Sequence, residues 1–160
     1  MEQSKVQETT DTKLKRIAEY SKQNPGCEYK WLMSHYNIEG LRSCFDELDG
    51  KKAVGIDQKT KDEYGKDLET NLSNLIARMK QMSYRPQPVR EVLIPKLGKP
   101  GATRPLGIST IEDKVVQSMT KKILESIYEP NFYDCSYGFR PRRGVHTAIK
   151  ALHKYLYNNE

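Results

Sequence analysis

Cysteines are few in this sequence, and long apolar runs are missing altogether. The three cysteines, Cys27, Cys44 and Cys135, are far apart and have neither the CxxC nor the HxxxH spacing of a zinc site. Their odd number argues against a disulfide framework, so we interpret them as reduced packing thiols. No apolar run approaches the length of a membrane span, and the N-terminus lacks the apolar core of a secretory signal. These absences predict a cytoplasmic protein that does not bind membranes.

Familiar motifs for phosphate and metal binding are also missing. The sequence contains no GxxxxGK[ST] loop and no dinucleotide-binding fingerprint. His146 and His153 lie seven positions apart, which is too far for a helical HxxxH pair. No metal-binding residue is therefore predicted in this chain.

Acidic residues are rare in two segments of the second half. The formal net charge is +6, and residues 1–80 contain 14 basic and 14 acidic residues, so the whole excess lies in residues 81–160. The first segment, residues 85–104, has one acidic residue, Glu91, and the second, residues 136–154, has none. Their basic side chains are Arg85, Arg90, Lys96, Lys99 and Arg104 in the first segment, and Arg140, Arg142, Arg143, Lys150 and Lys154 in the second. Two such segments are typical of the walls of a groove for a polyphosphate backbone. The alternative is a solvated basic surface.

Helical periodicity covers the first half of the chain after a polar tail at residues 1–11. A helix with its apolar residues at Leu14, Ile17 and Tyr20 should end at the "NPG" of residues 24–26. A short core helix should begin after the cap Asn37 and end at Gly50. Thr60 and Glu63 form a capping box, which predicts one long helix down to the prolines of "YRPQP".

The period changes in the second half. Residues 89–95 and 104–109 read as two strands, joined by the turn-rich "KLGKPGAT". Thr110 and Asp113 should cap a further helix, and a final helix should begin near Val145. With 160 residues, the chain is long enough for one compact domain or a core with an ordered extension. We expect an α+β fold that is mostly helical with a short antiparallel β-hairpin.

The tip of the expected hairpin has the chemistry of a phosphate site. Lys96 and Lys99 can act as point charges, and Arg104 can bind a phosphate with two parallel hydrogen bonds. The glycines allow the backbone to approach a bulky ligand closely.

Three stretches in a fixed order resemble a known family. They are "KKAVGIDQKT" (51–60), "YRPQPVREVLIPKLGKPGATRPLGISTIEDKVVQ" (84–117) and "SYGFRPRRGVHTAI" (136–149). Together they resemble the N-terminal and fingers regions of group II intron-encoded reverse transcriptases, which are also called maturases. The resemblance covers roughly residues 37–155, and three chained motifs make a specific signal.

The resemblance implies roles for individual residues. In this family a fingers hairpin closes over the incoming nucleotide, so Lys96 and Arg104 are expected to contact the dNTP triphosphate. Template or intron RNA is expected at Arg85, Arg90, Lys99, Pro105, Leu106, Gly107, Arg140, Arg142 and Arg143. Gly138 and Phe139 belong to the same template-bordering segment, and we interpret Phe139 as a core residue. The implied division is a tail and helix at 1–36, a helical N-terminal extension at 37–83 and a fingers region at 84–160.

The family's catalytic residues are not found in this chain. Polymerisation needs paired carboxylates that hold two Mg²⁺ ions, and the family carries them after the "YLYNNE" helix and in a Tyr-x-Asp-Asp turn. That turn does not occur here, and the acids of "FDELDG" and "IEDK" have the positions of helix-end and capping residues. We therefore expect part of a larger RNA-directed DNA polymerase, inactive alone and without a bound cofactor of its own.

Three functions remain open at this point. The first is the fingers part of an RNA-directed DNA polymerase that binds template-primer, intron RNA and dNTP. The second is a non-catalytic RNA-binding maturase module that assists splicing. The third is an unrelated small phosphate-binding enzyme, for which no acid-base constellation is present. An exposed patch near Phe132, Tyr133 and Phe139, facing the palm in the intact family, could also form a homodimer.

Overall fold

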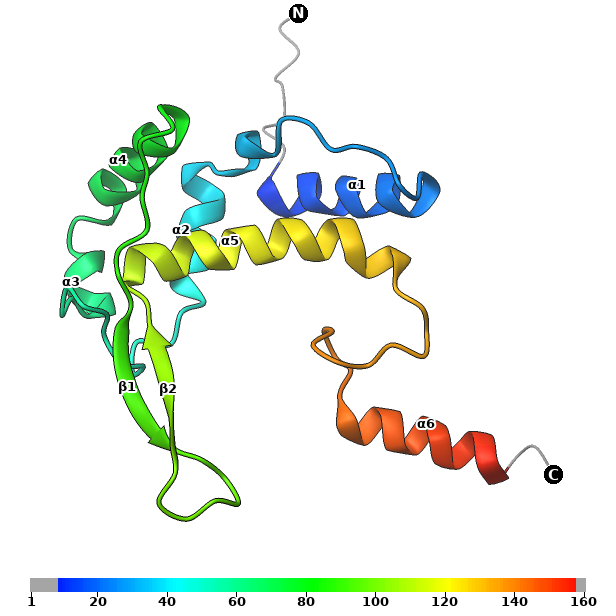
Figure 1. The fold of residues 1–160 in the computed structure, drawn as a ribbon. Coiled ribbons are helices and arrows are strands. Elements are labelled where there is room, and N and C mark those ends of the chain that lie inside the picture. Colours follow the sequence, from blue (N-terminus) through cyan, green and yellow to red (C-terminus); the bar gives the residue numbers. More distant parts are fainter. Residues whose placement is uncertain (1–8, 158–160) are drawn as a thin grey trace, which may run out of the picture.

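One long helix organises the molecule. The computed structural model describes residues 9–157, and its longest helix, α5 (Ile111–Tyr128), runs through the centre (Figure 1). Helices α1 (Thr10–Gln23) and α2 (Ile38–Asp46) pack on α5, and α4 (Leu68–Lys80) packs on α2. Residues 1–8, which hold most of the expected tail, lie outside the described residues, and Thr10 and Asp11, which the sequence assigned to that tail, belong to α1.

Side-chain caps set the starts of the helices as the sequence predicted. The Asn37 Oδ1 atom accepts a hydrogen bond from the Gly40 N–H at 2.8 Å. Glu63 donates its N–H to the Thr60 hydroxyl and accepts the Thr60 N–H at 2.8 Å, which confirms the capping box. Thr110 accepts from the Asp113 N–H at 3.2 Å, so the cap of α5 is also confirmed.

The prediction of one long helix after Thr60 is wrong. Two helices, α3 (Lys61–Gly65) and α4, replace it, because Asp67 leaves the helical backbone with φ −119° and ψ 37°. The Asn71 side-chain amide donates to the Tyr64 carbonyl at 2.9 Å and satisfies one of the groups freed at the break. The turn lets the Tyr64 ring lie against Phe45, with ring centroids 5.9 Å apart, while α4 faces α2.

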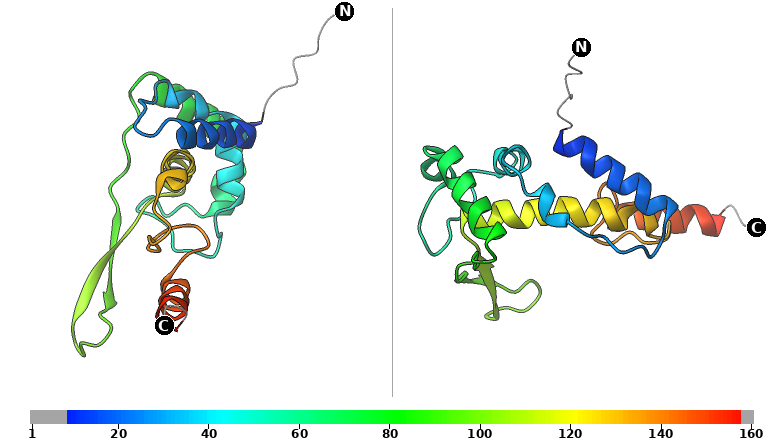
Figure 2. Two further views of the ribbon diagram at one scale, coloured as in Figure 1. Left: turned by 90° about the vertical axis from the view of Figure 1, so that its right-hand side faces the viewer. Right: turned by 90° about the horizontal axis from the view of Figure 1, so that it is seen from above.

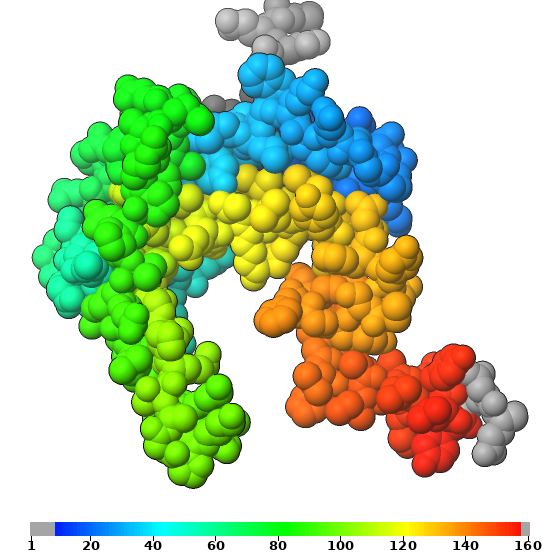
Figure 3. Space-filling view, viewed as in Figure 1, coloured from blue at the N-terminus to red at the C-terminus, as the bar shows by residue number. Residues whose placement is uncertain are grey.

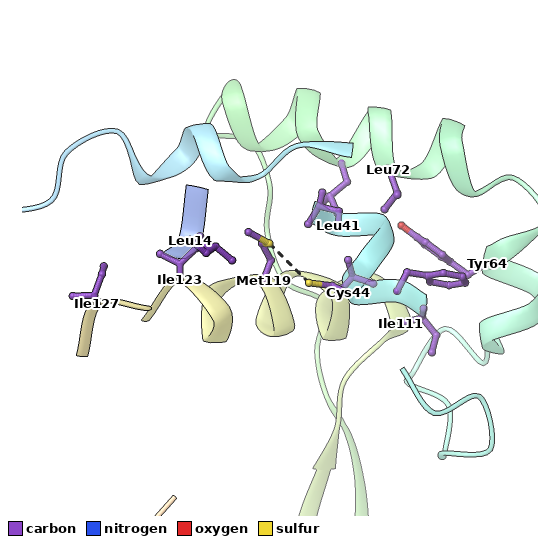
Figure 4. Close-up of a cluster of buried hydrophobic side chains, with 12 residues drawn as sticks. Leu14, Leu41, Cys44, Tyr64, Leu72, Ile111, Met119, Ile123 and Ile127 are labelled. Carbon is purple, nitrogen blue, oxygen red and sulfur yellow. Dashed lines mark hydrogen bonds between the residues drawn. The ribbon is translucent and has the colours of Figure 1, made fainter. Parts of the chain in front are cut away.

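The core lies between α5 and the helices above it (Figure 4). Its completely buried hydrophobic residues are Leu41, Cys44, Leu72, Leu75, Val115 and Met119. The Cys44 sulfur lies 3.9 Å from that of Met119, and all three cysteines are free. The packing role is confirmed for Cys44 but is wrong for Cys135, which is exposed. The core contains residues from all three predicted segments of the chain, 1–36, 37–83 and 84–160. The division of the chain into these segments stays a prediction.

The hairpin and the C-terminal helix extend from the same side of α5 (Figures 1 and 2). Strands β1 (Arg90–Pro95) and β2 (Thr103–Ile108) form an antiparallel pair near the start of α5. After the end of α5, the chain forms a short 3₁₀ turn, η2 (Glu129–Asn131), and then α6 (Val145–Tyr157). Another 3₁₀ turn, η1 (Leu32–His35), precedes α2. The molecule therefore has the shape of an arch (Figure 3). The mostly helical α+β fold with one hairpin is confirmed.

The final helix is exposed on all sides. None of the residues of α6 is buried, and the predicted apolar stripe of Val145, Ile149, Leu152 and Leu156 is between 58% and 73% exposed. Of the helices between residues 9 and 157, none combines the length and apolar character needed to traverse a lipid bilayer.

Gly55 places the loop of residues 51–60 against the root of the hairpin. A Cβ atom at this position would lie 2.6 Å from the Thr110 Cα and 2.7 Å from the Thr110 N. The same loop accepts a hydrogen bond at the Ala53 carbonyl from the Lys114 ammonium at 2.8 Å. The close approach requires a residue without a side chain.

We predict that Gly55→Ala lowers the free energy of unfolding by about 1–3 kcal/mol, because backbone atoms on both sides would have to shift. Urea denaturation measures the change. Gly138→Ala is the matched control, since a Cβ there meets nothing within 4 Å. Equal stability of the two variants would contradict the packing described.

Candidate nucleic-acid interface

The register of the hairpin brings Lys96 and Arg104 to one face. Ile94 pairs with Arg104, and the Lys96 N–H donates to the Ala102 carbonyl at 2.9 Å. Because side chains alternate along a strand, residues 94, 96, 102 and 104 project from the same face. Lys96 and Arg104 are diagonal neighbours there, about 7–8 Å apart at the backbone. Two exposed cations at this spacing can contact adjacent oxygens of one polyphosphate.

Two glycines shape the tip between the strands. Gly98 has φ +75° and Gly101 has φ +78°, a backbone region that other residues adopt at a cost. Lys99 lies between them and is exposed. No acidic residue occurs from residue 92 to residue 111, so the hairpin is positive along its whole outer half.

The buried carboxylate of Asp113 fixes the root of the hairpin. Asp113 is 3% exposed and accepts hydrogen bonds from the Gln87 N–H at 3.1 Å, from the Thr110 hydroxyl at 2.8 Å and from the Tyr84 hydroxyl. Gln87 precedes β1 and Thr110 follows β2, so one side chain holds both ends of the hairpin. Burial, followed by the hydrogen bond to Asp113, raises the pKa of Tyr84 above its ordinary value.

A second cluster of polar side chains surrounds the Glu112 carboxylate, next to Asp113 in α5. The Arg78 guanidinium donates to the Glu112 carboxylate at 2.7 Å, and the Tyr64 hydroxyl donates to the same oxygen at 3.4 Å. Burial and the neighbouring Glu112 charge raise the pKa of Tyr64. The hydrogen bond to Glu112 raises the pKa of Arg78. These contacts attach α3 and α4 to the start of α5, next to the root of the hairpin.

Arg140 holds together the segment that follows α5. Its side chain is 6% exposed and forms an ion pair with Glu129 at 2.9 Å. The same guanidinium donates to the carbonyls of Tyr133 at 2.8 Å and Ser136 at 3.0 Å, and it lies over the Phe132 ring at 5.2 Å. All three nitrogens of this guanidinium donate hydrogen bonds within the protein. Its predicted contact with template stays a prediction, while the structure gives it a supporting role.

The neighbouring arginines differ in their surroundings. Arg143 donates to the Asp134 carbonyl at 2.6 Å and to its carboxylate at 3.0 Å, with its guanidinium 5.7 Å from the Tyr137 ring centroid. Arg142 is exposed and has a left-handed backbone with φ 59°. Arg142 is therefore better placed than Arg140 to contact a ligand.

An apolar groove lies below α5, on the inner side of the arch. It measures about 530 Å³ and is lined mainly by α5 and by the segments that enter and leave the two arms. Its aromatic and proline residues are Tyr84, Pro86, Tyr128, Phe132, Phe139 and Pro141. Figure 3 shows this hollow, with part of the orange segment projecting into it. The basic hairpin and the basic segment 136–154 form the two arms beside it.

The predicted site residues thus differ in their placement and exposure. Lys96, Lys99, Pro105, Leu106 and Gly107 are exposed on the hairpin together with Arg104, while Arg142 and Arg143 lie on the opposite arm. Arg85 lies outside both arms, and its guanidinium donates to the carbonyls of Met82 and Tyr84. Arg90 is half-buried, and its Nε atom is buried without a partner among the residues described.

One interpretation from the sequence is wrong at this site. Phe139, which was expected in the core, is completely exposed. Phe132 and Tyr133 are exposed as expected, and self-association through them stays a prediction. Within residues 9–157, no group of three or more His, Cys, Asp and Glu side chains could hold a metal ion.

Comparison with known proteins yields several relatives, although no family model matches the chain. The chain is 44% identical over 103 residues to the group II intron-encoded protein LtrA of Lactococcus lactis subsp. cremoris. It is 38% identical over 103 residues to protein YkfC of Escherichia coli and 34% identical over 131 residues to an uncharacterized 91 kDa protein in the cob intron of Schizosaccharomyces pombe.

These alignments cover much of the chain but little of each relative. They span 64% of the chain and 16% of LtrA, 64% of the chain and 26% of YkfC, and 82% of the chain and 13% of the S. pombe protein. The chain thus corresponds to a small part of each of these longer proteins.

We predict that Arg140→Gln loosens the segment between α5 and α6, since Glu129 and two carbonyls would be left without their donor. The local free energy of opening should fall by about 1–3 kcal/mol. Hydrogen exchange at the Ser136 and Arg143 amides, which donate within this segment, measures it. Arg142→Gln is the control, because that side chain is exposed; equal protection in both variants would contradict the role of Arg140.

We predict a stability loss at alkaline pH that depends on Tyr84. Its pKa is raised in the folded protein, so the unfolded chain releases the proton first and stability falls as pH rises above about 10. Tyr84→Phe should be less stable than the parent near neutral pH but lose less stability on alkalinisation. Urea denaturation across the pH range tests this. Tyr133→Phe, which removes an exposed hydroxyl, should retain the parent's pH dependence.

Proposed function

Because the chain belongs to the family of group II intron-encoded proteins, we propose that it forms the nucleotide- and template-binding fingers part of an RNA-directed DNA polymerase. The observation that carries the proposal is the hairpin register, which brings the exposed side chains of Lys96 and Arg104 to one face. In this arrangement the ammonium and the guanidinium bind the triphosphate of an incoming dNTP. Pro105, Leu106 and Gly107, on the same strand as Arg104, border the base that is being copied.

The second arm supports the binding of template-primer and intron RNA. Arg142, Lys150 and Lys154 are exposed on it, and it has no acidic residue from residue 136 to residue 154. Phosphate contacts supply most of the hydrogen bonds in protein complexes with nucleic acids. A strand of RNA lying across the arch would therefore meet positive charge on both sides.

DNA synthesis is proposed for the longer protein and not for the described residues. Polymerisation depends on carboxylates that bind two Mg²⁺ ions, and residues 9–157 contain no suitable cluster. This part contributes instead by positioning the dNTP and the template, which can account for a large share of catalysis in phosphoryl transfer.

A second candidate function is assistance to splicing without polymerisation. The names of LtrA and of the S. pombe relative both refer to introns, which favours intron RNA as one ligand of this surface. Both functions use the same basic arms, but only the first needs Lys96 and Arg104 to bind a triphosphate.

We predict that RNA binding is steeply salt-dependent and that the two arms carry this dependence. Removing one phosphate contact should reduce the slope of log K against log salt by about 0.7 for a single strand. Fluorescence anisotropy with single-stranded RNA, a structured RNA and an RNA/DNA duplex measures the slope for the parent and for the double variant Lys96→Ala/Arg104→Ala.

The matched control is the double variant Lys15→Ala/Lys22→Ala, which removes two exposed positive charges from α1 instead of the hairpin. Its slope should equal that of the parent. Binding that is weak, insensitive to salt and unchanged by the hairpin substitutions would mean that the basic arms are solvated surface and would contradict the proposed function.

A further inference from the structure

A separate pocket lies between α1 and the segment that connects α1 to α2. Its lining residues are Lys13, Arg16, Ile17 and Tyr20 of α1, with Tyr29 and His35 of the connecting segment. Its volume of about 410 Å³ is within the range of small-ligand sites. Helix α1 lies on the side of α5 opposite to the hairpin and α6 (Figures 1 and 2). The pocket is therefore distinct from the two basic arms.

The connecting segment is attached at both ends, so the pocket is a formed feature of the fold. At its start, the Asn24 N–H and side-chain amide donate to the Tyr20 carbonyl at 2.9 Å and 3.0 Å. At its end, the Tyr36 hydroxyl lies 2.6 Å from the Thr120 hydroxyl of α5. Between these points, the Tyr29 ring meets the Tyr20 ring edge to face, with centroids 6.2 Å apart.

Two polar atoms at this pocket lack the hydrogen bonds that buried groups require. The Tyr29 hydroxyl oxygen and the His35 Nδ1 atom are both buried, and neither has a hydrogen-bond partner among residues 9–157. Unpaired buried polar atoms are uncommon in folded proteins, and a ligand is one way to satisfy them. Both atoms belong to side chains that line the pocket, so one ligand group placed there can satisfy both.

The charge around the pocket selects an anion. Lys13 and Arg16 line it, whereas no acidic side chain of the described residues does. None of the ion pairs between residues 9 and 157 involves Lys13. Burial, and then the Lys13 charge, lowers the pKa of His35, so the imidazole is neutral near pH 7. The remaining lining, from Ile17 and the two tyrosine rings, is mainly apolar.

We propose that this pocket binds a small organic anion in which a planar apolar ring carries one carboxylate or phosphate group. Lys13 pairs with the anionic group, and the Tyr29 hydroxyl and the His35 Nδ1–H donate hydrogen bonds to its oxygens. The ring of the ligand packs on Ile17 and Tyr20. Tyr20 is 52% exposed, so its side chain can change rotamer and let the ligand reach the two buried atoms. The site goes beyond the proposed function, because it uses neither basic arm.

The test is a nuclear magnetic resonance titration of the whole chain with benzoate, phenyl phosphate and the neutral benzyl alcohol. We expect the two anions to bind with a dissociation constant of about 1 mM or lower. Benzyl alcohol should bind at least about tenfold more weakly, because it has no charge to pair with Lys13. The tighter of the two anions shows whether the ligand carries a carboxylate or a phosphate. Lys96→Ala/Arg104→Ala should bind both anions as the parent does.

Two variants each remove one contact and keep the size of the side chain. Lys13→Met and Tyr29→Phe should each weaken benzoate binding by about tenfold. Lys15→Met removes an exposed charge from the same helix and should bind benzoate like the parent. Tyr29→Phe should also keep the free energy of unfolding measured in urea, because its hydroxyl has no partner to lose among the described residues.

Binding should take up a proton at His35. A bound anion offsets the Lys13 charge and so raises the pKa of His35, which means that benzoate affinity increases as the pH falls from about 7.5 to about 6. Of the described side chains that line the pocket, only His35 changes charge in this range. His35→Asn keeps a donor near the position of Nδ1 but cannot titrate, so its benzoate affinity should not depend on pH.

Three results would overturn the proposal. The first is no binding of either anion at about 10 mM, which would leave the proposed function standing. The second is equal affinity for benzyl alcohol, which would make the site a simple apolar hollow. The third is anion binding that neither Lys13→Met nor Tyr29→Phe weakens, which would place the anion elsewhere on the protein.

Discussion

A buried carboxylate must be hydrogen-bonded on all sides, and at Asp113 this requirement determines how the hairpin leaves the helices. Its partners come from before β1 and from after β2, so satisfying one side chain attaches both ends of the hairpin to α5. Gly55 then closes the other side of Thr110. A hairpin of two strands is marginal by itself, and this attachment gives it a defined direction.

The arm that follows α5 depends on a buried cation, Arg140, whose hydrogen bonds must also be satisfied. The Arg140 guanidinium is almost completely buried, and a carboxylate and two carbonyls accept its hydrogen bonds. A lysine could not satisfy all of these acceptors, since their arrangement requires the planar fork of a guanidinium. The two arms of the arch thus depend on one buried anion and one buried cation at opposite ends of α5. The charges left for ligands are those outside these two clusters.

Local chemistry was predictable from the sequence, and long-range pairing was not. The caps at Asn37, Thr60 and Thr110 involve residues three positions apart, and the turn chemistry around Gly98 and Gly101 is equally local, so these elements were predicted correctly. The break at Asp67 was not predicted, because the apolar period continues through it. The pairing of Arg140 with Glu129, and the exposure of Phe139 that follows, depend on a folded loop that no periodicity describes. A basic residue in a motif can support a site as well as contact a ligand.

The sequence separations of these tertiary contacts also imply an order of folding. Arg140 and Glu129 are 11 residues apart, Tyr84 and Asp113 are 29 apart, and the Ser21 hydroxyl that binds the Ile127 carbonyl is 106 residues from it. Loop-closure entropy grows with separation, so contacts near in sequence form with the least cost. The C-terminal arm can therefore close early, and the hairpin root can follow. Helix α1 has to wait until nearly the whole of α5 has been synthesised before it finds its place.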